Sequence, residues 1–215
     1  MSHADRLLVI DTATAACSVA LFEGETLLAR QHHVVGRGHA ERLLPMIADL
    51  PDGGRAQHIL VDVGPGSFTG IRVGIAAARA LALGWGGEAR GYSALALIAA
   101  AALAKGDMSE LAVITEGGHG EVFMQAFAAP FLALDEVQSL RPEAALGALG
   151  ALGGRLAIGS GTRWLADIDL DFPIVEAWPD AAHALLLPPD YRSLSPAPLY
   201  GRAPDAKIPA PKVAR

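Results

Sequence analysis

Cysteine is nearly absent from this chain, because Cys17 is the single cysteine among 215 residues. One thiol excludes an intrachain disulfide bond, and it also excludes a zinc site with two cysteine ligands. Cys17 lies in a run of strand-forming residues. We therefore expect its side chain to be a small buried hydrophobic group rather than a reactive one.

Positive charge is also scarce. The chain has 17 lysines and arginines against 23 aspartates and glutamates, which gives a net charge of −6 and a pI of about 5.6. Binding to nucleic acid draws most of its affinity from cationic contacts to phosphates. The sequence is therefore a poor candidate for holding nucleic acid without a partner.

Long apolar runs free of charge are missing too. Segment 91–104 comes closest and is too short to span a membrane. Residues 1–6 lack the apolar stretch of a signal peptide. We therefore expect a cytoplasmic protein without membrane contact. A hydrophobic content of 52% is enough for one large core or two small lobes.

What the sequence does contain is a strand, a glycine loop and a helix in succession. The apolar run 58–63 predicts a strand, and the glycines and proline of 64–70 must end it. The helix expected at 71–83 stops before Gly84. A glycine turn that opens a helix can present N–H groups to an anion. The alternative is a tight turn in which Ser67 or Thr69 caps the helix.

The helix at 71–83 is apolar on nearly all sides, which indicates burial on more than one side. One side can cover a sheet, and the other needs a second layer from this chain or another protein. The amphipathic helix expected at 41–50 could lie beside the helix 71–83 and contact the same partner. Packing in the core of this chain explains its apolar stripe equally well. Gly74 would then set the approach of a partner helix, so Gly74→Leu should weaken a complex and leave the isolated chain folded. The predicted docking face consists of Leu43, Met46, Ile47, Ile71, Arg72, Gly74, Ile75, Ala78 and Arg79.

Three ordered motifs give the chain a resemblance to a known family. They are Ile-Asp-Thr-Ala-Thr at 10–14, His-Ala-Glu-Arg-Leu-Leu-Pro at 39–45, and Val-Gly-Pro-Gly-Ser-Phe-Thr-Gly-Ile-Arg-Val-Gly at 63–74. Together they resemble the TsaB family of bacterial tRNA threonylcarbamoyladenosine biosynthesis proteins, which was once labelled M22 glycoprotease-like. The resemblance is close over roughly residues 5–128 and looser beyond them.

The resemblance implies a partner subunit without catalytic activity of its own. TsaB proteins bind TsaD, cooperate with the ATPase TsaE, and support transfer of a threonylcarbamoyl group to the adenosine beside the tRNA anticodon. By the same resemblance, tRNA is reached only through the complex, and ATP or ADP would bind at the complex with TsaD rather than tightly to this chain. The docking helices could also form a homodimer.

The expected fold is α/β, with two ribonuclease H-like (actin-like ATPase) lobes of which the second is reduced. Strand 7–10 ends at Asp11 and leads into a hairpin, and strand 111–115 ends at Glu116 and does the same. An architectural repeat of this kind is what a duplicated lobe shows. We expect an N-terminal lobe at 1–104, a reduced C-terminal lobe at 105–200 and an extended tail at 201–215.

The competing interpretation is an enzyme, either an actin-like ATPase acting by itself or a metalloprotease. The ATPase would place nucleotide on five residues of the first lobe, with Glu116 contributed by the second. However, the loop does not end in the Gly-Lys-Ser/Thr of a Walker A motif. No Ser/His/Asp or two-histidine arrangement can be assembled for a protease. The candidate nucleotide residues are Asp11, Thr12, Gly64, Gly66 and Ser67, and no metal ligand is predicted.

The remaining polar residues have ordinary interpretations. His39 has no second ligand four residues on, so we expect a solvated loop histidine there. His119 is expected in a turn, and the alternative is an acid–base pair with Glu121. Members of the family that this chain resembles commonly have Asp-Ala-Arg where this chain has Glu-Gly-Gly at 116–118, so this chain lacks that arginine.

Overall fold

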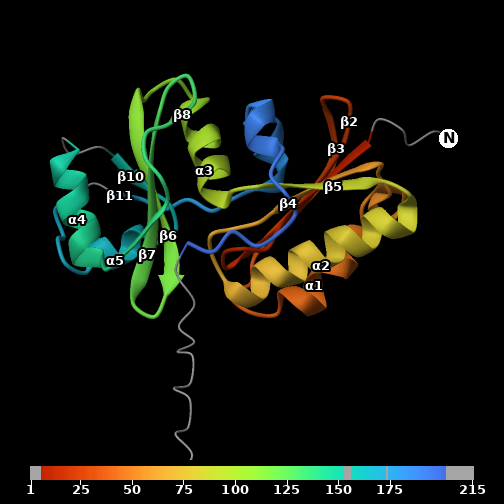
Figure 1. Ribbon diagram of the computed structural model, residues 1–215, viewed down its shortest axis with the longest axis horizontal. Coiled ribbons are helices and arrows are strands. Elements are labelled where there is room, and N and C mark those ends of the chain that lie inside the picture. The colour runs from red at the N-terminus through yellow and green to blue at the C-terminus, as the bar shows by residue number, and fades with distance from the viewer. Residues whose placement is uncertain (1–5, 153–155, 173, 202–215) are drawn as a thin grey trace, which may run out of the picture.

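The computed structural model describes residues 6–152, 156–172 and 174–201, and it contains two β-sheets with helices packed on them (Figure 1). The first sheet has the order β3-β2-β1-β4-β5. Strands β1, β2 and β3 are antiparallel neighbours, whereas β1, β4 and β5 are parallel. Their bounds are β1 (Arg6–Asp11), β2 (Ala16–Glu23), β3 (Thr26–Val34), β4 (His58–Asp62) and β5 (Glu88–Tyr92).

The second sheet repeats this arrangement, with the order β8-β7-β6-β10-β11 and with β9 paired to β7. Here β6 takes the place of β1, β7 is its antiparallel neighbour, and β10 and β11 are parallel to it. The prediction of two ribonuclease H-like lobes is therefore confirmed, and β10 and β11 are short, at three and two residues. The strands are β6 (Glu110–Gly118), β7 (Glu121–Ala128), β8 (Leu132–Ala133), β9 (Gln138–Leu140), β10 (Leu156–Ile158) and β11 (Ile174–Val175).

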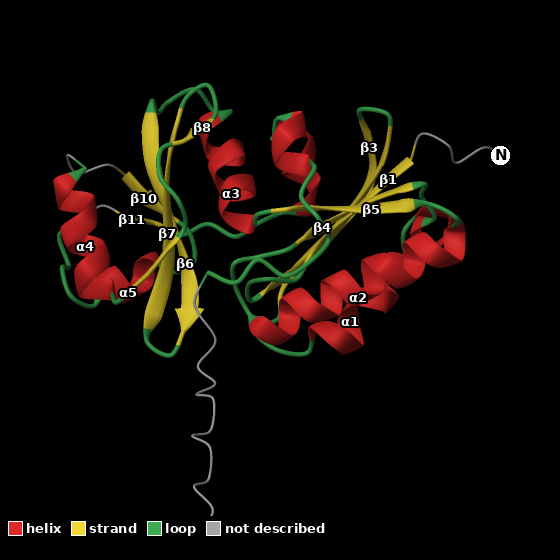
Figure 2. Cartoon of the chain, viewed as in Figure 1, coloured by secondary structure: helices red, strands yellow, loops and turns green. Residues whose placement is uncertain are grey.

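Five α-helices cover the sheets among the described residues. Helices α1 (His39–Ala48) and α2 (Phe68–Trp85) lie together on one face of the first sheet, and α4 (Pro142–Ala151) and α5 (Thr162–Ala166) lie on the outer face of the second (Figure 2). Helix α3 (Ala94–Leu103) stands between the two sheets. Because it is enclosed there, every residue of α3 except Ala101 is buried. This position explains why α3 consists of alanine, leucine and isoleucine alone.

Three short 3₁₀ helices complete the description: η1 (Pro51–Gly54), η2 (Ala181–Leu186) and η3 (Pro189–Arg192). Within the ranges that the structure describes, no helix is both long enough and apolar enough to cross a membrane. The predicted extended tail falls almost wholly outside the described residues.

Most of the predicted docking face packs inside this chain, which corrects the prediction. Seven of its nine side chains or Cα atoms are buried in the core that α1 and α2 form with the first sheet: Leu43, Met46, Ile47, Ile71, Gly74, Ile75 and Ala78. The physical reason is that the first sheet needs an apolar cover, and these two stripes supply it. Arg72 and Arg79 remain exposed.

Gly74 has a different role from the one predicted. A Cβ atom at this position would lie 2.4 Å from Oγ1 of Thr12 and 3.3 Å from a methyl group of Val61. Gly74 therefore sets the distance between α2 and its own sheet, not the distance to a partner helix. The prediction that Gly74→Leu leaves the isolated chain unaffected is wrong, because a larger side chain would overlap with buried atoms.

The chain returns to the first sheet after the second one is complete. Asp180 caps η2, accepts a hydrogen bond from Ser18 and forms an ion pair with Arg30 at 2.8 Å. Further on, Gly91 and Leu194 exchange two backbone hydrogen bonds. Helices η2 and η3 therefore pack on the face of the first sheet opposite α1 and α2, and the chain then runs along β5. The lobe boundaries at 104 and 200 stay predictions.

Candidate functional site

The glycine loop packs directly against the turn between β1 and β2. A Cβ atom on Gly66 would lie 2.1 Å from the carbonyl oxygen of Ala13, and one on Gly70 would lie 2.0 Å from that of Thr12. The Ser67 N–H donates to Ala13, and the Thr12 hydroxyl donates to the Gly70 carbonyl at 2.8 Å. These glycines therefore serve backbone-to-backbone packing.

Ser67 caps α2, as one of the two interpretations of the loop predicted. Its side-chain oxygen accepts a hydrogen bond from the Gly70 N–H at 3.2 Å, and its carbonyl accepts from Ile71. A cap of this kind satisfies N–H groups that an anion would otherwise meet at the start of the helix. The loop geometry thus favours a structural turn over a phosphate cradle.

Two buried carboxyl groups meet at the carboxyl ends of β1 and β4. Asp11 and Asp62 have no exposed surface, and each carboxyl group affects the pKa of the other. Tyr92 donates to Oδ2 of Asp11 at 2.8 Å, while Oδ1 of Asp62 accepts from the N–H groups of Gly64 and Ala94. The remaining oxygens, Oδ1 of Asp11 and Oδ2 of Asp62, meet no other donor. A proton shared by the two carboxyl groups would satisfy both oxygens.

The electrostatics agree with a shared proton. Burial raises the pKa of Asp11 from 3.8 to about 7, against the opposing effect of the hydrogen bond from Tyr92. Burial and the neighbouring charge of Asp11 raise the pKa of Asp62 well above its ordinary value. Desolvation disfavours the charged form of a carboxyl group, and a second carboxylate adds repulsion. The pair therefore keeps at least one proton near neutral pH.

The C-terminal segment lies over this part of the molecule. The Leu199 N–H donates to the Val63 carbonyl at 2.8 Å, and a Cβ on Gly201 would lie within 3.0 Å of both Phe123 and Pro65. Residues 199–201 thus touch the glycine loop of the first lobe and β7 of the second. The start of the loop, at Gly64 and Pro65, is therefore covered by the chain itself, whereas Ser67, Phe68 and Thr69 remain exposed.

The five candidate nucleotide residues are brought together, but not as an open site. Asp11 and Thr12 are fully buried with partners inside the chain, and Gly64 is buried with the Leu199 carbonyl 3.0 Å from where its Cβ would be. Ser67 is exposed and caps the helix. A nucleotide on these residues would have to displace internal contacts.

The corresponding turn of the second lobe is closed by an ion pair. Glu116 pairs with Arg163 of α5, and Glu121 accepts a hydrogen bond from Ser139 at 2.6 Å. His119 occupies the turn with a φ of 55°, as expected for a turn residue. In the described part of the chain, no group of three or more histidine, cysteine, aspartate or glutamate side chains is arranged to hold a metal.

His39 corrects one expectation. It is buried at the start of α1, and its Nε2 lies 3.1 Å from the Ala16 carbonyl. A solvated loop histidine was predicted, but the imidazole instead holds α1 against the first residue of β2.

The surface of α1 and α2 that faces away from the sheet carries apolar and small side chains. Leu83 is 86% exposed and Leu44 is 54% exposed. Between them lie exposed alanines that leave the backbone of α2 accessible to close approach. The members of this surface, called here the outer helical face, are Leu44, Ala48, Val73, Ala76, Ala80 and Leu83.

Two arginines border the outer helical face. Arg79 is exposed along α2. Arg72 donates to the Tyr200 hydroxyl at 2.6 Å, and its guanidinium lies 3.2 Å from the ring centre of Phe68. Both arginines lie on the surface, whereas the apolar stripe of α2 that was predicted beside them is buried. A second apolar stripe at 73, 76, 80 and 83 lies on the other side of the same helix.

Comparison with known proteins gives concordant matches. The family model described as TsaD: tRNA N6-adenosine threonylcarbamoyltransferase matches residues 31–138. The protein named tRNA threonylcarbamoyladenosine biosynthesis protein TsaB from Escherichia coli K12 is 40% identical over 126 residues, which cover 55% of this chain and 53% of that protein. Its namesake from Haemophilus influenzae is 43% identical over 84 residues, which cover 36% and 35%. The chain thus spans about half the length of the first relative and less of the second.

A solved structure extends the match over nearly the whole chain. The structure titled YeaZ from Pseudomonas aeruginosa has a TM-score of 0.75 and 26% sequence identity, and the match covers 91% of this chain and 99% of that one. The two-lobed arrangement described above is therefore shared with that protein.

Proposed function

We propose that this chain, which belongs to the TsaB family of tRNA threonylcarbamoyladenosine biosynthesis proteins, acts as a non-catalytic partner subunit that binds and activates a TsaD transferase. The observation that carries the proposal is the outer helical face of α1 and α2. It is apolar, it is exposed, and it is built from small residues at its centre.

The shape of this face suits a partner helix. Val73, Ala76 and Ala80 follow one another at spacings of three and four, so they form one stripe along α2. Alanine side chains permit a short distance between helix axes, and Leu83 supplies an apolar side chain that a partner can enclose. An exposed apolar patch of this kind marks an interaction site more often than an accident of composition.

The polar residues of the chain support a partner role over a catalytic one. Asp11 and Asp62 are sealed from solvent, and they accept hydrogen bonds from Tyr92 and from backbone N–H groups. Residues 199–201 cover the start of the glycine loop. A catalytic carboxylate must reach a substrate, and these two carboxyl groups do not.

The other members of the complex are part of the same proposal. TsaE and tRNA would join through TsaD, and ATP or ADP would bind at the complex and not tightly to this chain alone. A second copy of this chain could use the same outer helical face, in which case it would compete with TsaD.

The experiment is a charge placed in the middle of the outer helical face. Ala76→Glu should weaken binding to TsaD by about 2 kcal/mol, or roughly 30-fold, because the carboxylate would be desolvated in an apolar contact. It should not destabilise the isolated chain, since Arg72 and Arg79 stand four and three residues away on the same side of the helix. Calorimetric titration and thermal melts of the free chain measure these two effects.

Ala144→Glu is the matched control, because Ala144 is an exposed alanine on α4, in the other lobe. It should bind TsaD like the wild type. In a reconstituted modification reaction, tRNA threonylcarbamoylation should fall with Ala76→Glu and not with Ala144→Glu. Equal affinity of the two variants for TsaD would remove the outer helical face from the proposal.

A further inference from the structure

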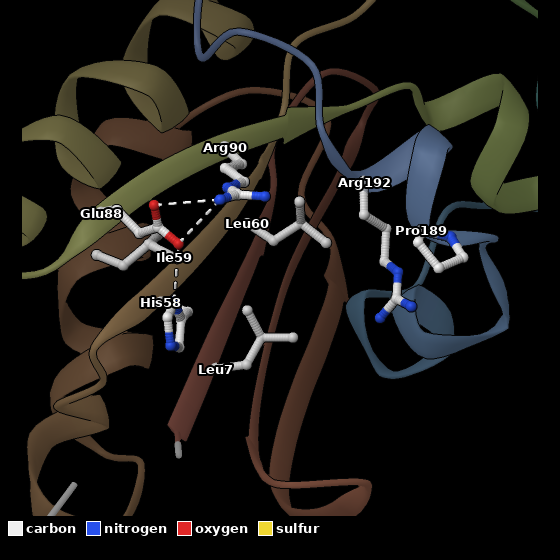
Figure 3. Close-up of a pocket in the computed structure, with 8 residues that line it drawn as sticks. All are labelled: Leu7, His58, Ile59, Leu60, Glu88, Arg90, Pro189 and Arg192. Atoms are coloured by element: carbon white, nitrogen blue, oxygen red, sulfur yellow. Dashed lines mark hydrogen bonds and ion pairs between the residues drawn. The ribbon is translucent and has the colours of Figure 1, made fainter. Parts of the chain in front are cut away.

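A groove crosses the first sheet at the end remote from the glycine loop. The sheet supplies Leu7 from β1, His58 and Leu60 from β4, and Glu88 and Arg90 from β5, while Pro189 and Arg192 of η3 face them (Figure 3). The open groove has a volume of about 330 Å³. This is the lower end of the range of small-molecule sites.

The register of the sheet explains why these side chains share one face. Leu7, His58 and Glu88 are paired across the three parallel strands, and Leu60 and Arg90 are paired one row further in. Residues two apart on a strand point to the same side. All five therefore face the side on which η3 lies, and the groove is a property of the sheet itself.

The charges in the groove are unbalanced. Glu88 is engaged twice, with His58 at 3.0 Å and with Arg90 at 3.3 Å. The hydrogen bond from His58 is the main cause that lowers the pKa of Glu88 below its ordinary value. One carboxylate thus serves two basic side chains, and it leaves the Arg192 guanidinium without an anionic partner among the described residues.

The Arg192 side chain gives the clearest indication of a ligand in this groove. Its Nε is buried and has no hydrogen-bond acceptor within the described structure. A buried donor left without an acceptor destabilises the folded state, so such a group calls for an explanation. Figure 3 shows Arg192 on the η3 side of the groove and Arg90 on the β5 side, with Leu7 and Leu60 on the sheet between them. An anion bound in the groove would be attracted to both guanidinium groups.

A second hollow continues from the same space. It shares Leu7, His58 and Arg192 with the groove, and it adds Leu185 and Leu186 of η2 and Gly24 and Glu25 of the turn between β2 and β3. A ligand with an anionic head at the arginines could lay a short hydrocarbon chain along the two leucines. Burial of its methylene groups there would add to the affinity.

We propose that this groove is a binding site for a small carboxylate or phosphate monoester that carries a short apolar chain. The head is held by Arg192 and Arg90, and the chain lies over Leu7 and Leu185. The site is on the opposite face of the first sheet from α1 and α2, so the proposal is independent of the docking function.

Titration followed by amide NMR shifts tests the proposal with four probes. Hexanoate and hexyl phosphate present the two head groups, hexanamide removes the charge, and acetate removes the chain. We expect the two hexyl anions to bind with dissociation constants of about 1 mM, acetate at least tenfold less tightly, and hexanamide not measurably at about 20 mM. The tighter of the two hexyl anions identifies the head group.

Variants separate the site from general surface charge. Arg192→Gln should weaken hexanoate binding at least tenfold, and Arg192→Lys should weaken it less, because lysine keeps the charge but lacks the fork of donors. Arg79→Gln removes the same charge from α2 and should bind like the wild type. Equal losses for Arg79→Gln and Arg192→Gln, binding of hexanamide as tight as that of hexanoate, or no binding of either hexyl anion at about 20 mM would overturn the proposal.

Discussion

Gly70→Ala should lower the free energy of unfolding by about 3 kcal/mol or more, whereas Gly84→Ala in the same helix should raise it by about 0.5–1 kcal/mol. The added methyl group at residue 70 would lie 2.0 Å from the carbonyl oxygen of Thr12, a backbone atom that cannot turn aside. At Gly84 nothing lies within 4 Å of the new Cβ. There the higher helix propensity of alanine acts without a steric cost.

Urea unfolding of both variants beside the wild type measures these changes. The same chemical substitution in one helix should then shift the transition in opposite directions. A small loss with Gly70→Ala would mean that the turn 12–14 moves easily away from α2. In that case the contact between the glycine loop and this turn would not be what requires glycine.

The stability of the chain should fall as pH rises from about 4 to 7, because of the Asp11–Asp62 pair. In the unfolded chain both carboxyl groups lose their protons near pH 4. In the folded chain Asp11 keeps its proton until about pH 7, and the pKa of Asp62 is raised well above its ordinary value. The folded state thus binds more protons than the unfolded state in this interval, so its free-energy advantage is lost as pH rises.

Asp62→Asn isolates this effect. The amide can keep the acceptor for Gly64 and Ala94 and can donate to Asp11, so it imitates the protonated carboxyl group. The variant has one titrating proton fewer per molecule. The slope of its free energy of unfolding against pH should therefore be less steep by up to about 1.4 kcal/mol per pH unit. The variant should therefore be clearly more stable than the wild type at pH 8.

Denaturant unfolding at pH 5, 6, 7 and 8 provides the comparison. The difference between Asp62→Asn and wild type should be small at pH 5 and should grow with each step. Parallel curves for the two proteins would show that Asp62 is ionised in the folded chain, and the shared proton would have to be abandoned.

The general architecture could be predicted because the same sequence pattern occurs twice along the chain. An apolar strand, an acid at its end and a hairpin occur at Leu7 and again at Leu111, and both open a sheet with the same strand order. The capping role of Ser67 was also open to prediction, since a serine before a helix has few other uses in a tight turn. Local patterns decide features of this kind.

The orientation of α2 could not be predicted in this way. The helix is apolar on both sides, so periodicity alone does not say whether Ile71 and Ala78 or Val73 and Ala80 face the sheet. The choice depends on Gly74, which must lie against Thr12, and this contact joins segments 62 residues apart. Tertiary packing decides which stripe is buried.

The contact between Asp11 and Asp62 was partly predictable from the sequence. Asp62 follows an apolar strand just as Asp11 does, and the carboxyl ends of neighbouring parallel strands lie at one edge of a sheet. Pairing of β1 with β4 is enough to join the two aspartates, so the strand pattern carried a signal for this contact. The return of residues 177–201 to the first sheet has no comparable local signal, because it depends on single contacts such as Asp180 with Ser18.

Thiol protection at residue 76 tests the central claim most directly. Cys17 is the single cysteine and is fully buried, so Ala76→Cys and Ala144→Cys each present one reactive thiol on the folded chain. If the outer helical face binds TsaD, saturating TsaD should slow maleimide labelling at position 76 at least tenfold and leave labelling at position 144 unchanged. Equal labelling at position 76 with and without TsaD, under conditions in which the complex is shown to form, would contradict the account.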